Sequence, residues 1–238
     1  MIAAIVYDIE KNGRYSMIKA LLFDMDGLMA DTEKATYSIW KKVYADHGYD
    51  LTVPMYARTC GMDRDDTKKL IYSYFHDDTI YDTCRPIWLD EYARMCREGQ
   101  IPLKKGLIEL LDYCDTHVLR KVVVSTSTPE RISAVLSPSG VYGRMDAYVT
   151  SLDVTRPKPD PQPFELGAEA AGFSASESLA LEDSMAGVES GKRAGCRVIC
   201  VPDLVKPDEA HRKYIDCVCE SLLDVIPWIE KINHGEMK

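Results

Sequence analysis

Two carboxylates one residue apart, Asp24 and Asp26, are the first residues in this sequence whose types and spacing could do chemistry. They follow residues 18–23, an almost uninterrupted apolar run that predicts a buried strand. In an open α/β sheet, ligands bind beyond the carboxyl ends of the strands. Gly27 permits the sharp turn that would bring both carboxylates over one site. The pair suits a carboxylate nucleophile with a neighbouring general acid/base, although an acidic turn at a strand end gives the same pattern.

A second pair of acids, Glu182 and Asp183, ends another short apolar run, residues 178–181. If both runs are strands of one parallel sheet, all four acids belong to the same edge. Hard carboxylate oxygens that also meet a phosphate are ligands that suit Mg²⁺.

Hydroxyl groups follow a third apolar run, residues 121–124. Ser125 and Thr126 come directly after it, and Pro129 is placed to begin a helix. Hydroxyls and free helix N–H groups at a strand end form a cradle for phosphate. A simple hydroxyl cap of the next helix explains the same residues equally well.

A stiff loop carries a lysine. Four prolines occur within residues 157–163, and Lys158 lies among them. Proline fixes φ, so such a loop holds a lysine against an anion at little entropic cost. A surface lysine in a proline turn is the plain alternative, and Arg156 could take the same role in a shifted register.

Taken in their order along the chain, the four motifs resemble the signatures of the haloacid dehalogenase-like (HAD) hydrolases. Residues 23–33, Phe-Asp-Met-Asp-Gly-Leu-Met-Ala-Asp-Thr-Glu, are similar to the first signature, in particular to that of the β-phosphoglucomutase-like branch. Ser125 takes the position of the second signature, Lys158-Pro-x-Pro-x-Pro-Phe resembles the third, and Glu182-Asp-Ser the fourth. The resemblance covers essentially residues 17–228.

The sequence between the first predicted strand and residue 102 has apolar residues at helical spacing and no good strand pattern. The fold class expected is therefore α/β, a Rossmann-like parallel sheet core flanked by helices, with a small all-helical cap domain inserted after the first strand. Residues 17–31 and 103–238 would form the core and 32–102 the cap, with 1–16 as an N-terminal extension. An insert at this point forms a lid over the site, and in the resembled family it selects the substrate.

Within the cap, the pattern Gly-x-x-Arg at residues 61–64 resembles the loop that binds the distal phosphate in β-phosphoglucomutases. A turn at Gly61 would leave Arg64 at a loop tip, where its guanidinium could hold a second anionic group bidentately. A solvated surface arginine is the alternative. We expect Gly27, Arg64 and Thr126 to contact the substrate.

The resemblance also implies the chemistry. Asp24 would attack phosphorus and form an aspartyl phosphate, and Asp26 would act as general acid and then general base. Lys158 and Ser125 would bind the transferring group. Mg²⁺ would be held by Asp24, the backbone carbonyl of Asp26, Glu182 and Asp183. The function expected is a Mg²⁺-dependent phosphatase for a small phosphorylated metabolite such as a sugar phosphate.

Two other functions remain open. A β-phosphoglucomutase-type isomerase would use a histidine twelve residues after the nucleophile, where this chain has Thr36, and a cap lysine, whereas no lysine lies between Lys69 and Lys104. A non-catalytic protein of the same fold could bind phosphorylated metabolites. Dehalogenase chemistry is disfavoured because it needs neither Asp26 nor a metal.

Composition limits the partners. The chain has 238 residues, so one or two domains are expected, and its net charge of −9 argues against nucleic acid. No apolar run is long enough to span a membrane. Residues 1–16 lack the basic start of a signal peptide, so we expect a cytoplasmic protein with eight reduced cysteines. A monomer is the habit of the resembled family.

Overall fold

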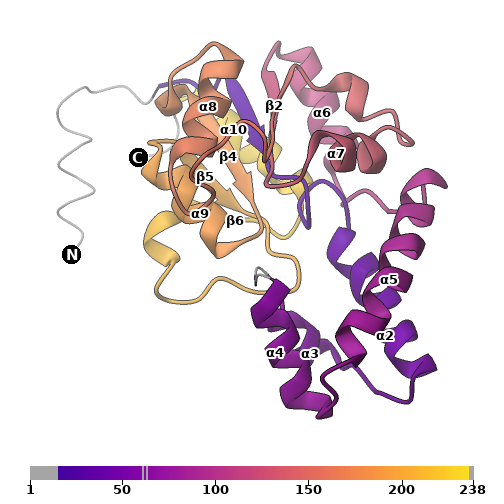
Figure 1. Ribbon diagram of the computed structural model, residues 1–238. Helices are drawn as coiled ribbons and strands as arrows, with labels where there is room; N and C mark the ends of the chain where they lie inside the picture. The colour runs from indigo at the N-terminus through magenta and orange to yellow at the C-terminus, as the bar shows by residue number, and fades with distance from the viewer. Residues whose placement is uncertain (1–15, 61, 63, 236–238) are drawn as a thin grey trace.

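The computed structural model describes residues 16–60, 62 and 64–235, so most of the predicted extension lies outside the described residues. Six parallel strands form one sheet in the order β3-β2-β1-β4-β5-β6 (Figure 1). The strands are β1 (Ala20–Phe23), β2 (Arg120–Val124), β3 (Ala147–Val149), β4 (Ser178–Glu182), β5 (Arg197–Cys200) and β6 (Cys217–Val218). The order places β1 between β2 and β4, so the carboxyl ends of three strands adjoin at the centre of the sheet.

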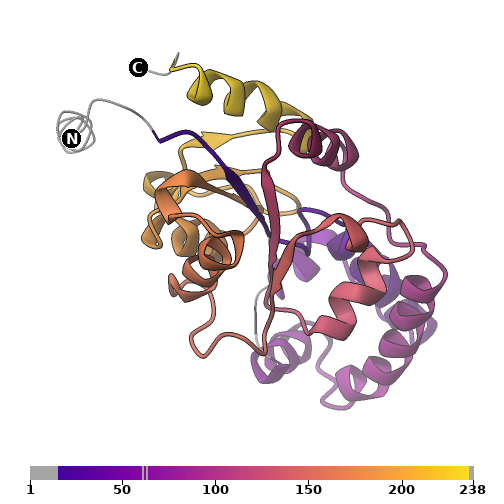
Figure 2. The ribbon, with the colours of Figure 1, turned by 90° about the horizontal axis from the view of Figure 1, so that it is seen from above.

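Both faces of the sheet are covered by helices, which explains why the strands read as apolar runs rather than as alternating patterns. Successive residues of β1 point to opposite faces: Ala20 and Leu22 pack into one core, Leu21 and Phe23 into the other. Figure 2 shows the strands between the two helical layers. One layer holds α8 (Gln162–Ala171) and α9 (Met185–Arg193); the other holds α6 (Leu107–Thr116), α7 (Pro129–Leu136) and α10 (Val225–Asn233).

Four helices between β1 and β2 form a separate group beneath the core in Figure 1. They are α2 (Thr32–Asp46), α3 (Val53–Ala57), α4 (Arg64–Phe75) and α5 (Ile80–Arg97). Stacked rings join α2 to α5: the ring centroids of Trp40 and Trp88 are 5.4 Å apart, and those of Trp40 and Tyr81 are 5.6 Å apart. Such stacks stabilise helix pairs beyond their buried area. We take this group as the cap and keep its predicted limits, residues 32–102, as a proposal.

The predicted fold class is confirmed, including the helical insert after the first strand. The short edge strand β6 was not predicted. All eight cysteines are free thiols. Within residues 16–60, 62 and 64–235, no helix has the length and apolarity that crossing a membrane requires.

The start of α6 supplies a test of the core. Gly106 has φ of +88°, and a Cβ at this position would lie 2.2 Å from the backbone nitrogen of Leu223. Gly106→Ala should therefore combine left-handed strain with a clash against backbone and lower the free energy of unfolding by about 2–5 kcal/mol.

Gly140→Ala is the matched control, because Gly140 has φ of +76° with nothing within 4 Å of its Cβ position. Its free energy of unfolding should fall only by the cost of left-handed backbone strain, about 1–2 kcal/mol. Urea unfolding followed by circular dichroism measures both variants, and equal losses would contradict the close contact at Leu223.

Candidate functional site

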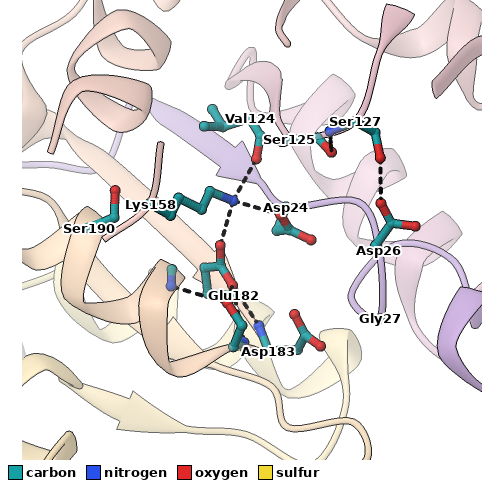
Figure 3. Close-up of polar contacts among 12 residues, drawn as sticks. Asp24, Asp26, Gly27, Val124, Ser125, Ser127, Lys158, Glu182, Asp183 and Ser190 are labelled. Atoms are coloured by element: carbon teal, nitrogen blue, oxygen red, sulfur yellow. Dashed lines mark hydrogen bonds and ion pairs between the residues drawn. The ribbon is translucent and has the colours of Figure 1, made fainter. Parts of the chain in front are cut away.

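The predicted site residues come together where β1, β2 and β4 end. Asp24 directly follows β1, and its backbone N–H donates to the Leu181 carbonyl of β4 at 3.0 Å. Ser125 directly follows β2, and Glu182 is the last residue of β4. Because the three strands are neighbours, the order of the sheet alone brings these side chains to one place (Figure 3).

The ammonium of Lys158 lies at the centre of this group. Its Nζ donates to Asp24 Oδ1 at 2.6 Å, to Glu182 Oε1 at 2.6 Å and to the Val124 carbonyl at 2.9 Å (Figure 3). All three donor protons of the ammonium are thus used, which holds the side chain in one orientation. Lys158 reaches the site from the loop between β3 and α8, and the Lys158–Pro159 peptide is cis.

The structure shows which of the two basic residues of the proline loop belongs to the site. Lys158 is buried between the two acids, with 6% of its side chain exposed. Arg156 instead donates to Asp160 at 3.0 Å on the surface, with 59% of its side chain exposed. The register with Lys158 as the buried cation is therefore the one present.

Burial is the largest cause of the raised pKa values of the acids at this site. Burial raises the pKa of Asp24 to about 8; the attraction of Lys158 acts against this rise and the repulsion of Glu182 adds to it. Burial also opposes the charge of Lys158, but Asp24 and Glu182 outweigh it and raise the pKa of Lys158 above its ordinary value. Burial, followed by repulsion from Asp24 and Glu182, raises the pKa of Asp183 well above its usual range. Without a further cation, the acids at this site do not all ionise easily.

Both carboxylate oxygens of Glu182 are engaged. Oε1 accepts from Lys158, while Oε2 accepts from the backbone N–H groups of Asp183 and Ser184, each at 3.1 Å, and from Ser184 Oγ at 2.9 Å. Gly187 in the first turn of α9 leaves room for this carboxylate, because a Cβ there would lie 1.9 Å from Glu182 Oε1. Glu182 is therefore fixed by its surroundings and in turn fixes Lys158.

The carboxylate of Asp183 is differently placed. One oxygen from each of Asp24, Glu182 and Asp183 lies within 4.8 Å of the others. Across residues 16–60, 62 and 64–235, no hydrogen bond to the Asp183 carboxylate is found. Gly27, with φ of +81°, leaves space beside it, since a Cβ there would lie 2.2 Å from Asp183 Oδ2. Crowded, under-bonded carboxylate oxygens with raised pKa values fit a hard divalent cation such as Mg²⁺.

Asp26 is held by two residues that sequence reasoning missed. Ser127 Oγ donates to Asp26 Oδ2 at 2.8 Å (Figure 3), and Arg131 Nη2 donates to Asp26 Oδ1 at 2.9 Å. Thr126, the hydroxyl that was expected to contact substrate, is exposed on the surface. A strand-end Ser-x-Ser pattern contains the signal for Ser127. A single sequence contains none for Arg131, because its partner lies 105 positions away.

Ser125 is buried at the end of β2. It is 5% exposed, and its Oγ accepts from the Ser127 backbone N–H at 3.1 Å. The Ser125 hydroxyl proton therefore remains available for an acceptor in the site.

A cavity of about 310 Å³ lies between the cap helices and α7, and Arg131, which donates to Asp26, forms part of its wall. Arg131 on its core side stacks over the ring of Tyr92 from α5, with 5.0 Å between guanidinium and ring centroid. Arg64 lies on the cap side, where it donates to Asp82 at 3.0 Å, and Thr36 also lines the cavity. The predicted turn at Gly61 lies outside the described residues. The lining residues are Glu33, Thr36, Trp40, Tyr56, Thr59, Cys60, Met62, Arg64, Thr67, Tyr81, Arg85, Trp88 and Arg131.

A further buried acid, Asp203, lies beside Gly27 and was also not predicted. Its side chain is 4% exposed, and Lys104 Nζ donates to its Oδ1 at 2.7 Å. A Cβ on Gly27 would lie 3.5 Å from Asp203 Oδ2, so Asp203 adjoins the same turn as Asp183. Repulsion from Asp203 also contributes to the raised pKa of Asp183.

The raised pKa of Asp24 predicts how stability depends on pH when metal is chelated. The folded-state value of about 8 lies above the ordinary value of 3.8 that the unfolded chain would have. The stabilising effect of the bound proton is complete below pH 4 and is lost as the pH rises towards 8. We expect urea midpoints in EDTA to fall from pH 5 to pH 8 and this slope to shrink in Asp24→Asn.

Asp183 contributes in the same direction, so some slope should remain in that variant. Asp90→Asn removes an exposed carboxylate from α5 and should keep the full slope. Unchanged slopes in all three proteins would contradict the burial argument.

Comparison with known proteins agrees with this geometry. Residues 21–201 match the family model described as haloacid dehalogenase-like hydrolase. YhcW of Bacillus subtilis, a protein assigned as a phosphatase, is 27% identical over 199 residues, covering 79% of this chain and 86% of YhcW. The N-acetylmuramic acid 6-phosphate phosphatase of Pseudomonas aeruginosa is 28% identical over 187 residues, covering 77% of this chain and 81% of that enzyme.

Among solved structures, β-phosphoglucomutase from Clostridium difficile superposes with a TM-score of 0.70 at 19% identity, over 93% of this chain and 99% of that one. This likeness shows the shared fold. Since the family model spans the first strand, the cap and the strands that carry Ser125 and Glu182, the chain belongs to the haloacid dehalogenase-like hydrolases.

Proposed function

We propose that this protein is a Mg²⁺-dependent phosphatase that hydrolyses a small phosphorylated metabolite through an aspartyl phosphate on Asp24. The observation that carries the proposal is the buried group of Asp24, Lys158 and Glu182 beside the under-bonded carboxylate of Asp183. Relatives named as phosphatases of phosphorylated sugars support the same activity.

In the first half-reaction, an oxygen of Asp24 attacks phosphorus in line with the leaving oxygen. The new O–P bond forms as the ester P–O bond breaks, and its electron pair goes to the leaving oxygen, which takes a proton from Asp26. Lys158 holds Asp24 Oδ1 at 2.6 Å, which leaves the second oxygen free to attack. The Ser125 hydroxyl donates to a phosphoryl oxygen as charge develops on it. Lys158, whose three protons are already donated, stabilises the same charge through its own positive charge.

In the second half-reaction, water attacks the phosphorus of the aspartyl phosphate. Asp26, now ionised, takes a proton from this water, and the P–O bond to Asp24 breaks, which restores the free carboxylate and releases inorganic phosphate. Ser127 and Arg131 hold Asp26 between these two steps.

We expect Asp24, Asp183 and the Asp26 backbone carbonyl to hold Mg²⁺. When bound, the ion neutralises charge between the Asp24 carboxylate and the substrate phosphate. Because both oxygens of Glu182 are already engaged, we expect it to act chiefly through Lys158.

Two features of the sequence favour hydrolysis over the mutase alternative. Thr36, at the position where a mutase has its histidine, lies on the cavity wall. No lysine occurs between Lys69 and Lys104 to take the part of the cap lysine. A phosphoenzyme in such a cap should lose its phosphoryl group to water rather than to a second sugar hydroxyl.

Asp24→Asn should abolish turnover, by roughly 10⁴-fold or more, because an amide cannot act as the nucleophile. Phosphate release from a panel of sugar and other small monophosphates with Mg²⁺ measures this loss, and Asp90→Asn should retain activity. The panel includes β-glucose 1-phosphate with a trace of the bisphosphate. Formation of glucose 6-phosphate faster than phosphate release would favour the mutase, and near-normal activity of Asp24→Asn would refute both.

Activity should disappear in EDTA, return with Mg²⁺ and not return with Ca²⁺, whose larger and looser coordination spoils in-line geometry. Asp183→Ala should raise the Mg²⁺ concentration needed for half-maximal rate by about tenfold or more, because it removes a direct ligand. Phosphate release titrated against each ion measures both effects. Full activity in EDTA would exclude the metal assignment.

A further inference from the structure

Two thiols lie side by side at the edge of the sheet. Cys217 belongs to the edge strand β6 and Cys219 directly follows that strand, and their Sγ atoms are 3.9 Å apart. Residues two apart along extended backbone point to the same face, and both side chains pack into the same core layer. Cys200 on β5 packs into the opposite layer and therefore lies on the other side of the sheet.

The backbone on either side of the pair is anchored. Just before it, the Asp216 carboxylate accepts from the Val198 backbone N–H at 2.8 Å and from Lys192 Nζ at 2.7 Å. At its other end, the Cys219 backbone N–H donates to the Cys200 carbonyl at 2.9 Å. These anchors keep the two thiols close together in the folded chain, which favours a reaction between them over a reaction with a second molecule.

The two thiols differ in their access to solvent. Cys217 is partly exposed, whereas Cys219 is buried. Burial, followed by repulsion from Cys217, raises the pKa of Cys219 to about 12. Because the thiolate is the reactive form and needs access to its reagent, Cys217 is the thiol that would meet an oxidant first. Cys219 is then the neighbour that can react with the product.

The spacing of the two residues allows a bond between their sulfur atoms. Cα atoms two residues apart in a strand are about 6.6 Å apart, and disulfides usually join Cα atoms about 4.4–6.8 Å apart. From their separation of 3.9 Å, the sulfur atoms need to approach by about 1.9 Å to reach bonding distance. Rotation of the partly exposed Cys217 side chain can supply much of this movement.

We propose that Cys217 and Cys219 are an oxidation site, at which a hydroperoxide converts the two thiols into a reversible intrachain disulfide. In the first step, the Cys217 thiolate attacks the peroxide oxygen that carries hydrogen. The S–O bond forms as the O–O bond breaks, and the second oxygen leaves with the electron pair and takes a proton from water. Cys217 is now a sulfenic acid.

In the second step, the Cys219 sulfur attacks the sulfur of the sulfenic acid. The S–S bond forms, the S–O bond breaks, and the departing hydroxide takes the Cys219 proton and leaves as water. The two sulfur atoms together lose two electrons, and the peroxide gains them. A small thiol such as glutathione reverses the change, because its thiolate can attack the partly exposed Cys217 sulfur and form a mixed disulfide that a second thiol releases.

This inference is independent of the proposed phosphatase activity, since β4 and β5 lie between the pair and β1, the strand that Asp24 follows. Its test therefore needs no turnover. Trypsin cuts after Lys213 and Lys231, which leaves both thiols in one peptide, residues 214–231, that contains no other cysteine. The state of this pair can therefore be read separately from the other six thiols.

The folded full-length protein is treated with hydrogen peroxide, freed of peroxide with catalase, denatured in iodoacetamide without reductant and digested. We expect peptide 214–231 to carry no label and to be about 2 Da lighter than its reduced, unlabelled form. Treatment with glutathione before denaturation should restore two labels. Two labels on the peptide after peroxide, or an oxygen adduct on Cys217 in place of the bond, would overturn the proposal.

Cys219→Ala removes the second thiol, so oxidation of Cys217 should stop at oxygen adducts of about 16 or 32 Da. Cys60→Ala is the matched control. Cys60 is also a partly exposed thiol, but its Sγ contacts Glu33 and the Tyr56 carbonyl rather than a second thiol. Its removal should leave the disulfide of peptide 214–231 unchanged. Loss of that disulfide in Cys60→Ala would instead assign the bond to a different pair. The wild-type measurement decides the matter even if Cys219→Ala fails to fold.

Discussion

The ammonium of Lys158 lies between two buried carboxylates, those of Asp24 and Glu182, and the rest of the site depends on this contact. Two like charges buried side by side would repel strongly, and an ammonium buried alone would lose its proton. The loop that carries Lys158, the turn at Gly187 that admits Glu182 and the parallel strands that align both acids all serve this one arrangement. If Asp24 is the nucleophile, as proposed, it is already oriented when substrate arrives.

The second acid works in a different environment. Asp26 lies two residues after Asp24 and accepts hydrogen bonds from Ser127 and Arg131, both of which follow β2. The proposed nucleophile, Asp24, is therefore fixed by β1, β4 and the proline loop, whereas the proposed acid/base, Asp26, is fixed by Ser127 and by Arg131 of α7. This division allows two carboxylates two residues apart to have different roles.

Motifs at strand ends were predictable from the sequence because each is local. An apolar run followed by acids, hydroxyls or a proline-bound lysine identified Asp24, Ser125, Lys158 and Glu182, and the order of these runs indicated the α/β fold. Arg131 and Asp203 could not be predicted, since their partners are distant in the chain and depend on how the cap and the sheet pack. The orientation of Arg64 towards Asp82 likewise follows from helix packing within the cap.

Arg131 touches both Asp26 and the Tyr92 ring of the cap, so the cap and the proposed proton donor are physically linked. A cap that rotates or exchanges its aromatic residues also changes the surroundings of the proton donor. In this protein, a substitution at Tyr92 that alters the fit of the leaving group would therefore also alter the position of Arg131 and the hydrogen bond that Arg131 donates to Asp26. A change of the cap that shifts substrate preference by this route would be accompanied by a change in the pH dependence of turnover.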